Sequence, residues 1–406
     1  MKNESYSDDQ PIQYAKETIC AKDQRVLSSG QSHITPIHAT SSFSYESIED
    51  SMAVFKKEKE GFVYSRFSNP TVQTVETKLS LLEGHGTDLE PGCLLTSSGL
   101  SAISTLALTL LKSGDTVITQ ADLYGGTTEL FHKVVAKNGV NIMTVDFNDL
   151  EELKSVLSSH SVQLIYMETP SNPMLNCIDL KKISDLAKQN GVLTAVDNTF
   201  STFYLQQPLA LGVDYVVYST TKYLNGHGNS IAGAIITKNM ADRSAVWEVL
   251  KLLGTNSNPW DAWLLHNGLK TLALRLDRHC SNAMRIAEYL QDLPTVRKVN
   301  YPGLLTHSSH KVAKDQMSQY GGMLSFEIDG DMQAAVNFMN NTKLCTIAAT
   351  LGNVDTLLLH PSSSSHLNVP KEIREASGIS DTLIRMSVGI EKYDDLVNDI
   401  GLALPA

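Results

Sequence analysis

The chain has 406 residues, of which 42% are hydrophobic and 19% charged, with a formal net charge of -11 at pH 7. This length predicts two or three packed domains with a core large enough to fold without disulfides or a structural metal. The acidic balance argues against a general nucleic-acid or anionic-membrane binder, because either partner requires a basic face.

The cysteines and the apolar pattern indicate the compartment. Five cysteines are scattered along the chain without a C-x-x-C motif, so we expect no disulfide framework and no metal site. No stretch reaches the length of a membrane span, and the first residues lack the apolar core of a secretory signal. We therefore expect a cytoplasmic protein in a reducing compartment.

Residues 1–62 are polar and weakly periodic. They predict an extended arm with one short helix near residues 12–20 and little regular structure between 31 and 62. The arm is either a disordered tail or a segment that reaches a partner subunit.

Beyond the arm, Asn69-Pro70 ends one element, and Thr71 can cap a helix that runs to about residue 82. Tyr64 and Arg66 lie two apart in an extended segment, so they face the same way and could bind a phosphate, although this pair is also common on surfaces.

Between about residues 91 and 238 the sequence alternates between short apolar runs and helical segments. The runs predict strands at 93–96, 116–119, 141–145, 163–167, 192–196, 213–218 and 231–236, and the segments predict helices at 101–112, 127–137, 150–159 and 180–189. This alternation predicts an α/β domain with a mostly parallel sheet covered by helices on both sides. In such sheets, ligands bind at the carboxyl ends of the strands.

Polar motifs follow five of these predicted strands. Ser98, Gly99 and Leu100 precede a long helix, whose N-terminus is suited to a phosphate, although a plain helix cap is the alternative. Tyr124 precedes two glycines and could stack on a flat cofactor, or simply pack on its own helix. Two prolines stiffen the loop that carries Asn172, which makes this residue a rigidly placed donor.

Two further charged residues complete the series. Asp197 ends a buried strand, and a carboxylate there needs a partner such as a protonated pyridine nitrogen. Ser219 and Thr221 alternate on one side of the chain and precede Lys222. A lysine amine beside two hydroxyl groups can form a Schiff base with pyridoxal 5'-phosphate (PLP), whereas a polar strand end with an exposed lysine is the bland alternative. The order of all five motifs together favours PLP.

After about residue 250 the pattern becomes that of a smaller α+β unit. It predicts helices at 261–274, 276–290, 332–341 and 393–402, and strands at 322–328, 357–359 and 383–388. Arg385 lies within the last apolar strand and is either paired structurally or available to a substrate carboxylate. We thus expect an arm at 1–62, a large domain at 63–255 and a C-terminal domain at 256–406.

The chain resembles the PLP-dependent trans-sulfuration (Cys/Met metabolism) enzymes from about residue 35 to residue 402. The most specific segments are VYSRFSNPT (63–71), DLYGGT (122–127), ETPSNP (168–173), VDNTF (196–200), STTKYLNGH (219–227) and IRMSVGIE (384–391). The family includes methionine γ-lyase, cystathionine γ-lyase, cystathionine γ-synthase and O-acetylhomoserine sulfhydrylase. The resemblance implies the fold-type I (aminotransferase-like) architecture of PLP enzymes and a homotetramer of two tight dimers.

The resemblance also implies a role for each site residue. Lys222 would hold PLP and transfer protons, Asp197 would pair with the pyridine nitrogen, Asn172 would contact the ring hydroxyl, and Tyr124 would stack on the ring and protonate the leaving group. The remaining cofactor contacts would be Ser98, Gly99, Leu100, Ser219 and Thr221, with Tyr64 and Arg66 supplied by the neighbouring subunit. Arg385 would bind the α-carboxylate of a small amino-acid substrate, with Thr350 and Ser365 nearby.

The implied reaction is γ-elimination from methionine, homocysteine or cystathionine, which gives 2-oxobutanoate, ammonia and a thiol. The alternative is γ-replacement on an O-acyl-homoserine; a third reading, an aminotransferase, is not favoured by any motif. Features of individual branches conflict. Methionine γ-lyases usually carry cysteine where Gly126 stands, and Asn229, Thr350 and Asp355 also depart from the usual family residues. In contrast, the segments around His279 and Met317 look most like the methionine γ-lyase branch.

Overall fold

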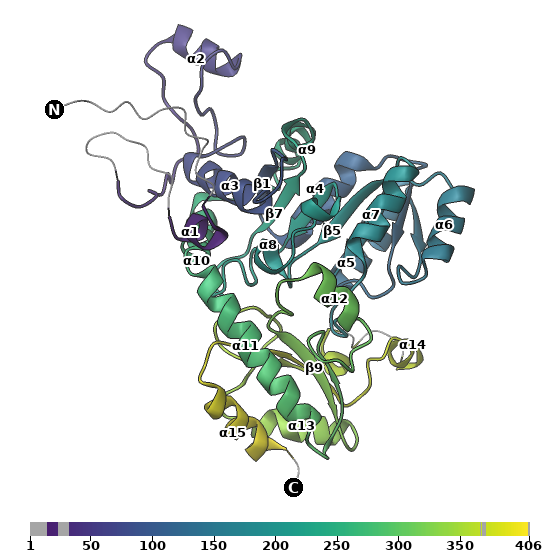
Figure 1. The fold of residues 1–406 in the computed structure, drawn as a ribbon. Helices are drawn as coiled ribbons and strands as arrows, with labels where there is room; N and C mark the ends of the chain where they lie inside the picture. The colour runs from purple at the N-terminus through teal and green to yellow at the C-terminus, as the bar shows by residue number, and fades with distance from the viewer. Residues whose placement is uncertain (1–13, 23–31, 366, 368–370, 405–406) are drawn as a thin grey trace, which may run out of the picture.

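The computed structural model describes residues 14–22, 32–365, 367 and 371–404. Its larger domain is built on a seven-stranded sheet in the order β1-β7-β6-β5-β4-β2-β3 (Figure 1). The strands are β1 (Gly92–Thr96), β2 (Thr116–Thr119), β3 (Asn141–Thr144), β4 (Leu164–Glu168), β5 (Leu193–Asp197), β6 (Tyr215–Tyr218) and β7 (Gly233–Thr237). Only β7 runs against its neighbours, β1 and β6, so the predicted mostly parallel sheet is confirmed.

Successive strand residues belong to two different cores, because side chains alternate between the two faces of a sheet. On β1, Cys93 and Leu95 join the core beneath α3 (Pro70–Glu83), α6 (Leu150–Ser159) and α7 (Leu180–Gln189). Leu94 joins the core beneath α4 (Gly99–Leu110) and α9 (Met240–Leu253) on the opposite face. Both faces of the sheet are therefore covered by helices, which explains why the strand sequences are continuous apolar runs.

The smaller C-terminal domain contains a five-stranded sheet in the order β10-β11-β12-β9-β8. Its strands are β8 (Val296–Asn300), β9 (Met323–Ile328), β10 (Thr346–Ile347), β11 (Leu357–Leu359) and β12 (Leu383–Ser387). Helix α11 (Leu272–Gln291) runs from the larger domain into the smaller one and packs on β8 and β9, near α13 (Met332–Asn341) and α15 (Tyr393–Ala403) (Figure 1). The predicted smaller α+β domain is confirmed.

The arm contains two helices. Helix α1 (Lys16–Ala21) packs against α3 and α11, and residues 12–13 of the predicted helix lie outside the described residues. Helix α2 (Ile48–Phe55) stands away from the body of the molecule (Figure 1). The expectation of little regular structure between 31 and 62 is wrong for α2. Ser47 caps this helix by accepting from the Asp50 N–H, and two acidic residues favour its first turn.

Several predicted boundaries are wrong for local reasons. The helix expected at 261–274 is divided between α10 (Pro259–Leu269) and α11, and α10 starts early because Asn258 caps it and Pro259 suits its first position. Helix α9 and strand β8 were not predicted. Asn239 caps α9, and β8 is a half-exposed edge strand without a continuous apolar run.

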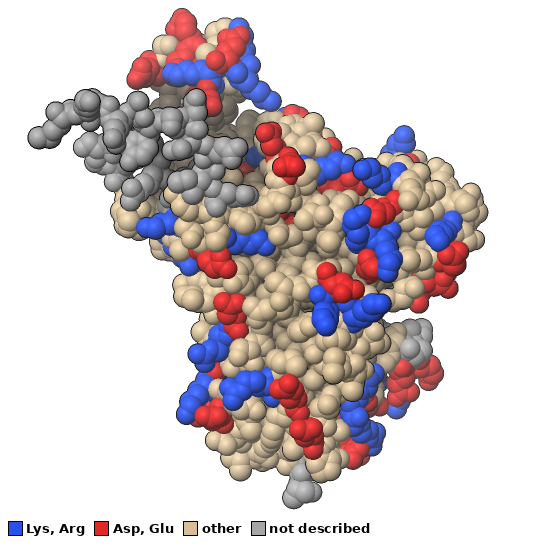
Figure 2. Space-filling view, in the orientation of Figure 1, with Lys and Arg blue, Asp and Glu red and all other residues tan. Residues whose placement is uncertain are grey.

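The remaining short elements connect these layers. The helix expected at 127–137 consists of α5 (Gly125–Leu130) followed by a π-helical turn (Phe131–Val135) and a 3-10 turn (Ala136–Asn138). The others are α8 (Thr202–Leu205), α12 (His310–Gln316), α14 (Lys371–Ala376) and 3-10 turns at Leu209–Leu211 and Pro361–Ser363. Within the described ranges, no helix has both the length and the apolar character needed to cross a membrane. On the face shown in Figure 2, basic side chains are interspersed with acidic ones.

Candidate active site

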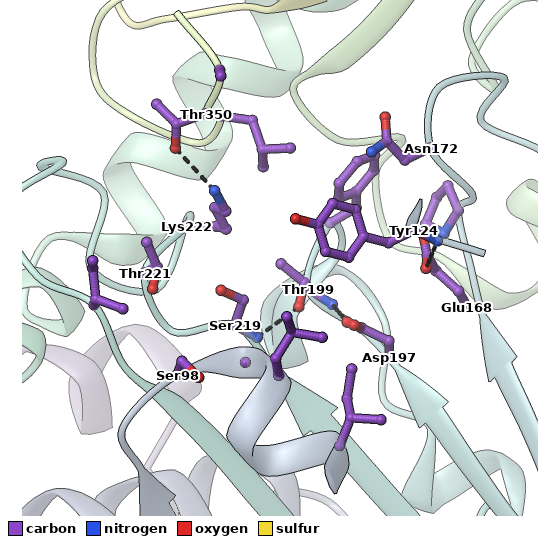
Figure 3. A pocket seen from close by; sticks show the side chains of 18 of the residues that line it. Ser98, Tyr124, Glu168, Asn172, Asp197, Thr199, Ser219, Thr221, Lys222 and Thr350 are labelled. Atoms are coloured by element: carbon purple, nitrogen blue, oxygen red, sulfur yellow. Dashed lines mark hydrogen bonds between the residues drawn. The ribbon is translucent and has the colours of Figure 1, made fainter. Parts of the chain in front are cut away.

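A cavity of about 290 Å³ lies at the carboxyl ends of the strands of the larger domain. Loops that follow β1, β2, β4, β5 and β6 line one side, and residues 349–351 and 385 of the smaller domain close the other (Figure 3). Eleven of the residues predicted for the site line this cavity: Ser98, Gly99, Leu100, Tyr124, Asn172, Asp197, Ser219, Thr221, Lys222, Thr350 and Arg385. The ligand position expected for a parallel α/β sheet is therefore where the polar motifs meet.

Lys222 follows β6 and is held from the smaller domain. Its Nζ donates a hydrogen bond to the Thr350 hydroxyl at 2.9 Å (Figure 3). Burial and the nearby positive charge of Arg385 lower the pKa of Lys222 to about 8. A larger fraction of the amine is then neutral near pH 7 than for an exposed lysine. The structure thus presents a positioned amine that can attack a carbonyl carbon.

One end of the cavity is suited to a phosphate group. Helix α4 begins at Gly99, and Ser98 caps it by accepting from the Ser101 N–H. A Cβ atom at position 99 would lie 2.8 Å from Cβ of Ser219, so glycine is needed for the helix N-terminus to approach β6 this closely. The first N–H groups of α4 and the Ser219 hydroxyl are available donors. The hydroxyl of Thr221, in contrast, exchanges hydrogen bonds with the backbone of Ala232 at 3.1 and 3.2 Å.

The opposite part of the cavity is suited to a nitrogen-containing ring. Asp197 ends β5, and one of its carboxylate oxygens accepts the Thr199 N–H at 3.0 Å. Burial raises the pKa of Asp197, so a cation beside it would stabilise the ionised carboxylate. The hydroxyl of Tyr124 points across the cavity toward Lys222 (Figure 3). A pyridinium nitrogen would supply the cation, and Tyr124 lines the same cavity as Asp197.

Arg385 is buried in β12 but has neutral partners. Its Nη1 donates to Oδ1 of Asn172 at 3.2 Å, and its Nη2 donates to the carbonyl of Thr350 at 2.9 Å. Its buried Nε has no hydrogen-bond partner among the described residues. No carboxylate of the described chain forms an ion pair with it, so its charge is not neutralised within the part of the protein that we describe. Of the two readings of Arg385, the one in which it awaits a substrate carboxylate has the stronger support.

Three predicted residues do not line this cavity. Arg66 donates to the carbonyl of Lys251 and lies 4.9 Å from the centroid of the Phe67 ring. Tyr64 is 42% exposed and lies beside Arg66 at the base of the arm. Ser365 lies outside the cavity, with its carbonyl oxygen 3.9 Å from the position of a Cβ at Gly125. A contact from Tyr64 and Arg66 to the cavity of a neighbouring subunit remains a prediction.

The sequence motifs contained two polar cavity residues to which we assigned no role. The hydroxyl of Thr199 accepts the Ser219 N–H at 2.8 Å and so joins the loops after β5 and β6. Glu168 ends β4 and accepts the Tyr124 N–H at 2.7 Å. The argument used for Asp197, a carboxylate at the end of a buried strand, would also have identified Glu168.

These groups fit PLP. The cofactor has an aldehyde, a phosphate and a ring nitrogen, and the cavity presents a lysine amine, a helix N-terminus with hydroxyl groups, and a carboxylate as a partner for each. The unpaired Nε of Arg385 leaves a further position for an anionic group of an amino-acid substrate. When bound, PLP would withdraw electrons from the substrate carbon atoms attached to it.

Comparison with known proteins identifies the family. The family model described as Cys/Met metabolism PLP-dependent enzyme matches residues 17–405. The chain is 42% identical over 367 residues to the L-methionine gamma-lyase of Fusobacterium nucleatum subsp. polymorphum, covering 90% of this chain and 91% of that protein. It is 44% identical over 343 residues to the cystathionine beta-lyase of Lactococcus lactis subsp. cremoris (strain MG1363), covering 84% and 88%.

Solved structures give the same result. The structure of cystathionine gamma synthase from Xanthomonas oryzae pv. oryzae in complex with aminoacrylate and cysteine matches with a TM-score of 0.89 and 35% identity, covering 96% of this chain and 97% of that one. The predicted fold-type I architecture is confirmed, and the expected PLP-dependent carbon–sulfur lyase agrees with the family and with the names of the relatives. The chain therefore belongs to the Cys/Met metabolism family of PLP-dependent enzymes.

Proposed function

We propose that the protein catalyses PLP-dependent γ-elimination from a sulfur amino acid: methionine, homocysteine or cystathionine. With one water consumed, the products are 2-oxobutanoate, ammonia and a thiol. The observation that carries the proposal is that Lys222, Tyr124 and the incompletely bonded Arg385 face one cavity. Together they provide a base, an acid and an anchor for an amino-acid carboxylate.

Each of these side chains has a distinct task. Arg385 would bind the α-carboxylate and so orient the substrate over the loops that follow β4 and β5. Lys222, with its lowered pKa, would remove the proton from Cα and return protons during turnover. The Tyr124 hydroxyl would donate a proton to the leaving sulfur. Thr350 would keep the amine of Lys222 in place between these transfers.

Two other reactions are possible at the same site. γ-Replacement on an O-acyl-homoserine is the main alternative, supported by the structural likeness to a cystathionine gamma synthase. β-Elimination is a second alternative, supported by the likeness to the cystathionine beta-lyase of Lactococcus lactis. We place γ-elimination ahead of γ-replacement because the methionine gamma-lyase of Fusobacterium nucleatum is 42% identical to this chain, compared with 35% for the synthase structure.

Product analysis with the purified holoenzyme tests this proposal. We expect 2-oxobutanoate from at least one of methionine, homocysteine and cystathionine, at a rate that exceeds thiol capture on O-acetylhomoserine. Faster thiol capture would favour the transferase, and pyruvate as the main product from cystathionine would favour β-elimination. Lys222→Ala is the matched control and should abolish both the reaction and the borohydride-reducible visible absorbance of lysine-bound PLP.

We further propose that the enzyme is a cytoplasmic homotetramer whose dimers share their active sites. The arm supports this proposal, because α2 stands away from its own subunit and exposes Ile48, Met52 and Phe55, which lie on one side of the helix. Tyr64 and Arg66 lie at the base of the arm, outside their own cavity. A neighbouring subunit would cover the apolar side of α2 and receive this tyrosine and arginine at its phosphate site.

A further inference from the structure

Two carboxyl groups lie side by side beneath the cavity. Glu168 and Asp197 are the last residues of β4 and β5, and they are paired in register across these parallel strands. Side chains in register on neighbouring parallel strands project from the same face of the sheet. Both residues line the cavity, and Glu168 is only 6% exposed. Asp197 is assigned to the ring nitrogen of PLP, whereas Glu168 has no assigned role.

Glu168 is bonded to one of the loops that surround the cofactor ring. Its Oε2 accepts the N–H of Tyr124, the residue expected to stack on the ring, at 2.7 Å (Figure 3). The backbone of Asn172, the residue expected to contact the ring hydroxyl group, also faces this carboxyl group and acts on it in the direction of the ionised form. The carboxyl group of Glu168 therefore fixes the position of the Tyr124 backbone above the sheet.

The two loops differ in how they are held. The Asn172 loop has hydrogen bonds of its own, from the Ser171 N–H to the Asn176 carbonyl at 3.0 Å and from Arg385 to the Asn172 side chain at 3.2 Å. Tyr124 precedes the first turn of α5 and has no side-chain cap. The Asn172 loop contains Pro170 and Pro173, which have no N–H to donate. Glu168 itself is fixed, because the Gln120 side chain accepts from its N–H at 2.9 Å and donates to its carbonyl at 3.0 Å. The carboxyl group is thus a rigid acceptor for the backbone N–H of Tyr124.

The charges around Glu168 favour its neutral form. Its neighbours Asp197 and Asp122 are acidic, and it forms no ion pair with a lysine or arginine of the described residues. Two adjacent buried carboxyl groups do not both ionise readily. Burial and the charge of Asp197 raise the pKa of Glu168 well above its usual range. The other titratable groups that face this region are Tyr124, Tyr166, Lys222 and Arg385.

We propose that Glu168 is a positioning residue that, as a neutral acid, holds Tyr124 against the PLP ring while Asp197 carries the negative charge. This inference rests on the proposed roles of Tyr124 and Asp197. Glu168 does not itself need to touch the substrate. Its contribution is to fix the stacking tyrosine through its backbone N–H.

Two substitutions of similar size separate this role from simple filling of space. Glu168→Gln keeps a neutral group with an oxygen acceptor, whereas Glu168→Met fills the site without a comparable acceptor. PLP is titrated into the cofactor-free proteins, and visible absorbance and circular dichroism are recorded from pH 6 to 9. We expect the glutamine variant to match the wild type, and the methionine variant to bind PLP at least tenfold more weakly with an altered visible circular dichroism.

Each result has a defined meaning. Wild-type PLP affinity and circular dichroism in Glu168→Met would overturn the positioning role. If the methionine variant does not fold, Glu168→Asp gives the same comparison, because it draws the acceptor back by one methylene. A downward shift of about one unit or more in the pH midpoint of the Glu168→Gln absorbance would show that Glu168 is ionised, and would overturn the neutral form. Absence of lysine-bound PLP in the wild type would instead contradict the proposed function.

Discussion

Replacement of Gly126 by alanine tests how closely activity depends on the placement of Tyr124. A Cβ atom at position 126 would lie 2.6 Å from Cε1 and 3.2 Å from Cζ of the Tyr124 ring. Ordinary carbon–carbon contacts are about 3.5–4.0 Å, so the ring must move by roughly 1 Å. Because Tyr124 is 46% exposed, the ring can move without disturbing the core.

The consequence should appear in catalysis rather than in folding. Alanine is favoured over glycine within a helix by up to about 1 kcal/mol, and Gly126 does not have a positive φ. Misplacement of a reacting group by about 1 Å can cost roughly 100-fold in rate. We therefore expect the kcat for 2-oxobutanoate release to fall by about two orders of magnitude in Gly126→Ala.

The neighbouring glycine provides a matched control. A Cβ atom at Gly125 would have no heavy atom nearer than the Ser365 carbonyl oxygen, at 3.9 Å, which is an ordinary contact. Gly125→Ala should therefore retain kcat within about threefold, consistent with the small effect of a tolerated substitution. Thermal unfolding of both variants confirms that they are folded. Equal activity of the two alanine variants, whether high or low, would refute this account of Gly126.

Three further predictions concern the amine, the subunit contact and the core. The rate at which cofactor-free protein captures PLP should rise about tenfold per pH unit below pH 8 and level off above it, because burial and Arg385 lower the pKa of Lys222. Arg385→Leu should move the midpoint of this pH profile to higher pH. An unmoved midpoint would contradict the contribution of Arg385. Mixed oligomers of Arg66→Ala and Lys222→Ala subunits should regain activity that neither variant has alone, whereas no recovery would argue against shared sites. Tyr218→Phe should lower the free energy of unfolding in urea by about 1–3 kcal/mol, because the buried Glu83 loses a 2.6 Å hydrogen bond. An unchanged free energy of unfolding would show that this bond does not stabilise the fold.

Local patterns in the sequence were sufficient to predict most elements of the larger domain. Short apolar runs indicated its strands, because covering both faces of a parallel sheet requires apolar side chains on both sides. They also indicated where the candidate cavity lies, because parallel strands present their carboxyl ends at one edge. Helices α2 and α9 were missed. Their sequence evidence is local but polar, because they are marked by the capping residues Ser47 and Asn239.

Contacts between distant residues decided the chemistry of the site. Lys222 and its partner Thr350 are 128 positions apart, and Arg385 is 213 positions from Asn172. The sequence left open whether Arg385 is paired; its neutral partners and unsatisfied Nε became evident only in the folded chain. Likewise, the sequence placed Glu168 and Asp197 at two strand ends, but only the register of β4 with β5 made them neighbours. A sequence motif determines which groups a strand end offers, whereas tertiary packing determines which groups share a proton, a hydrogen bond or a substrate.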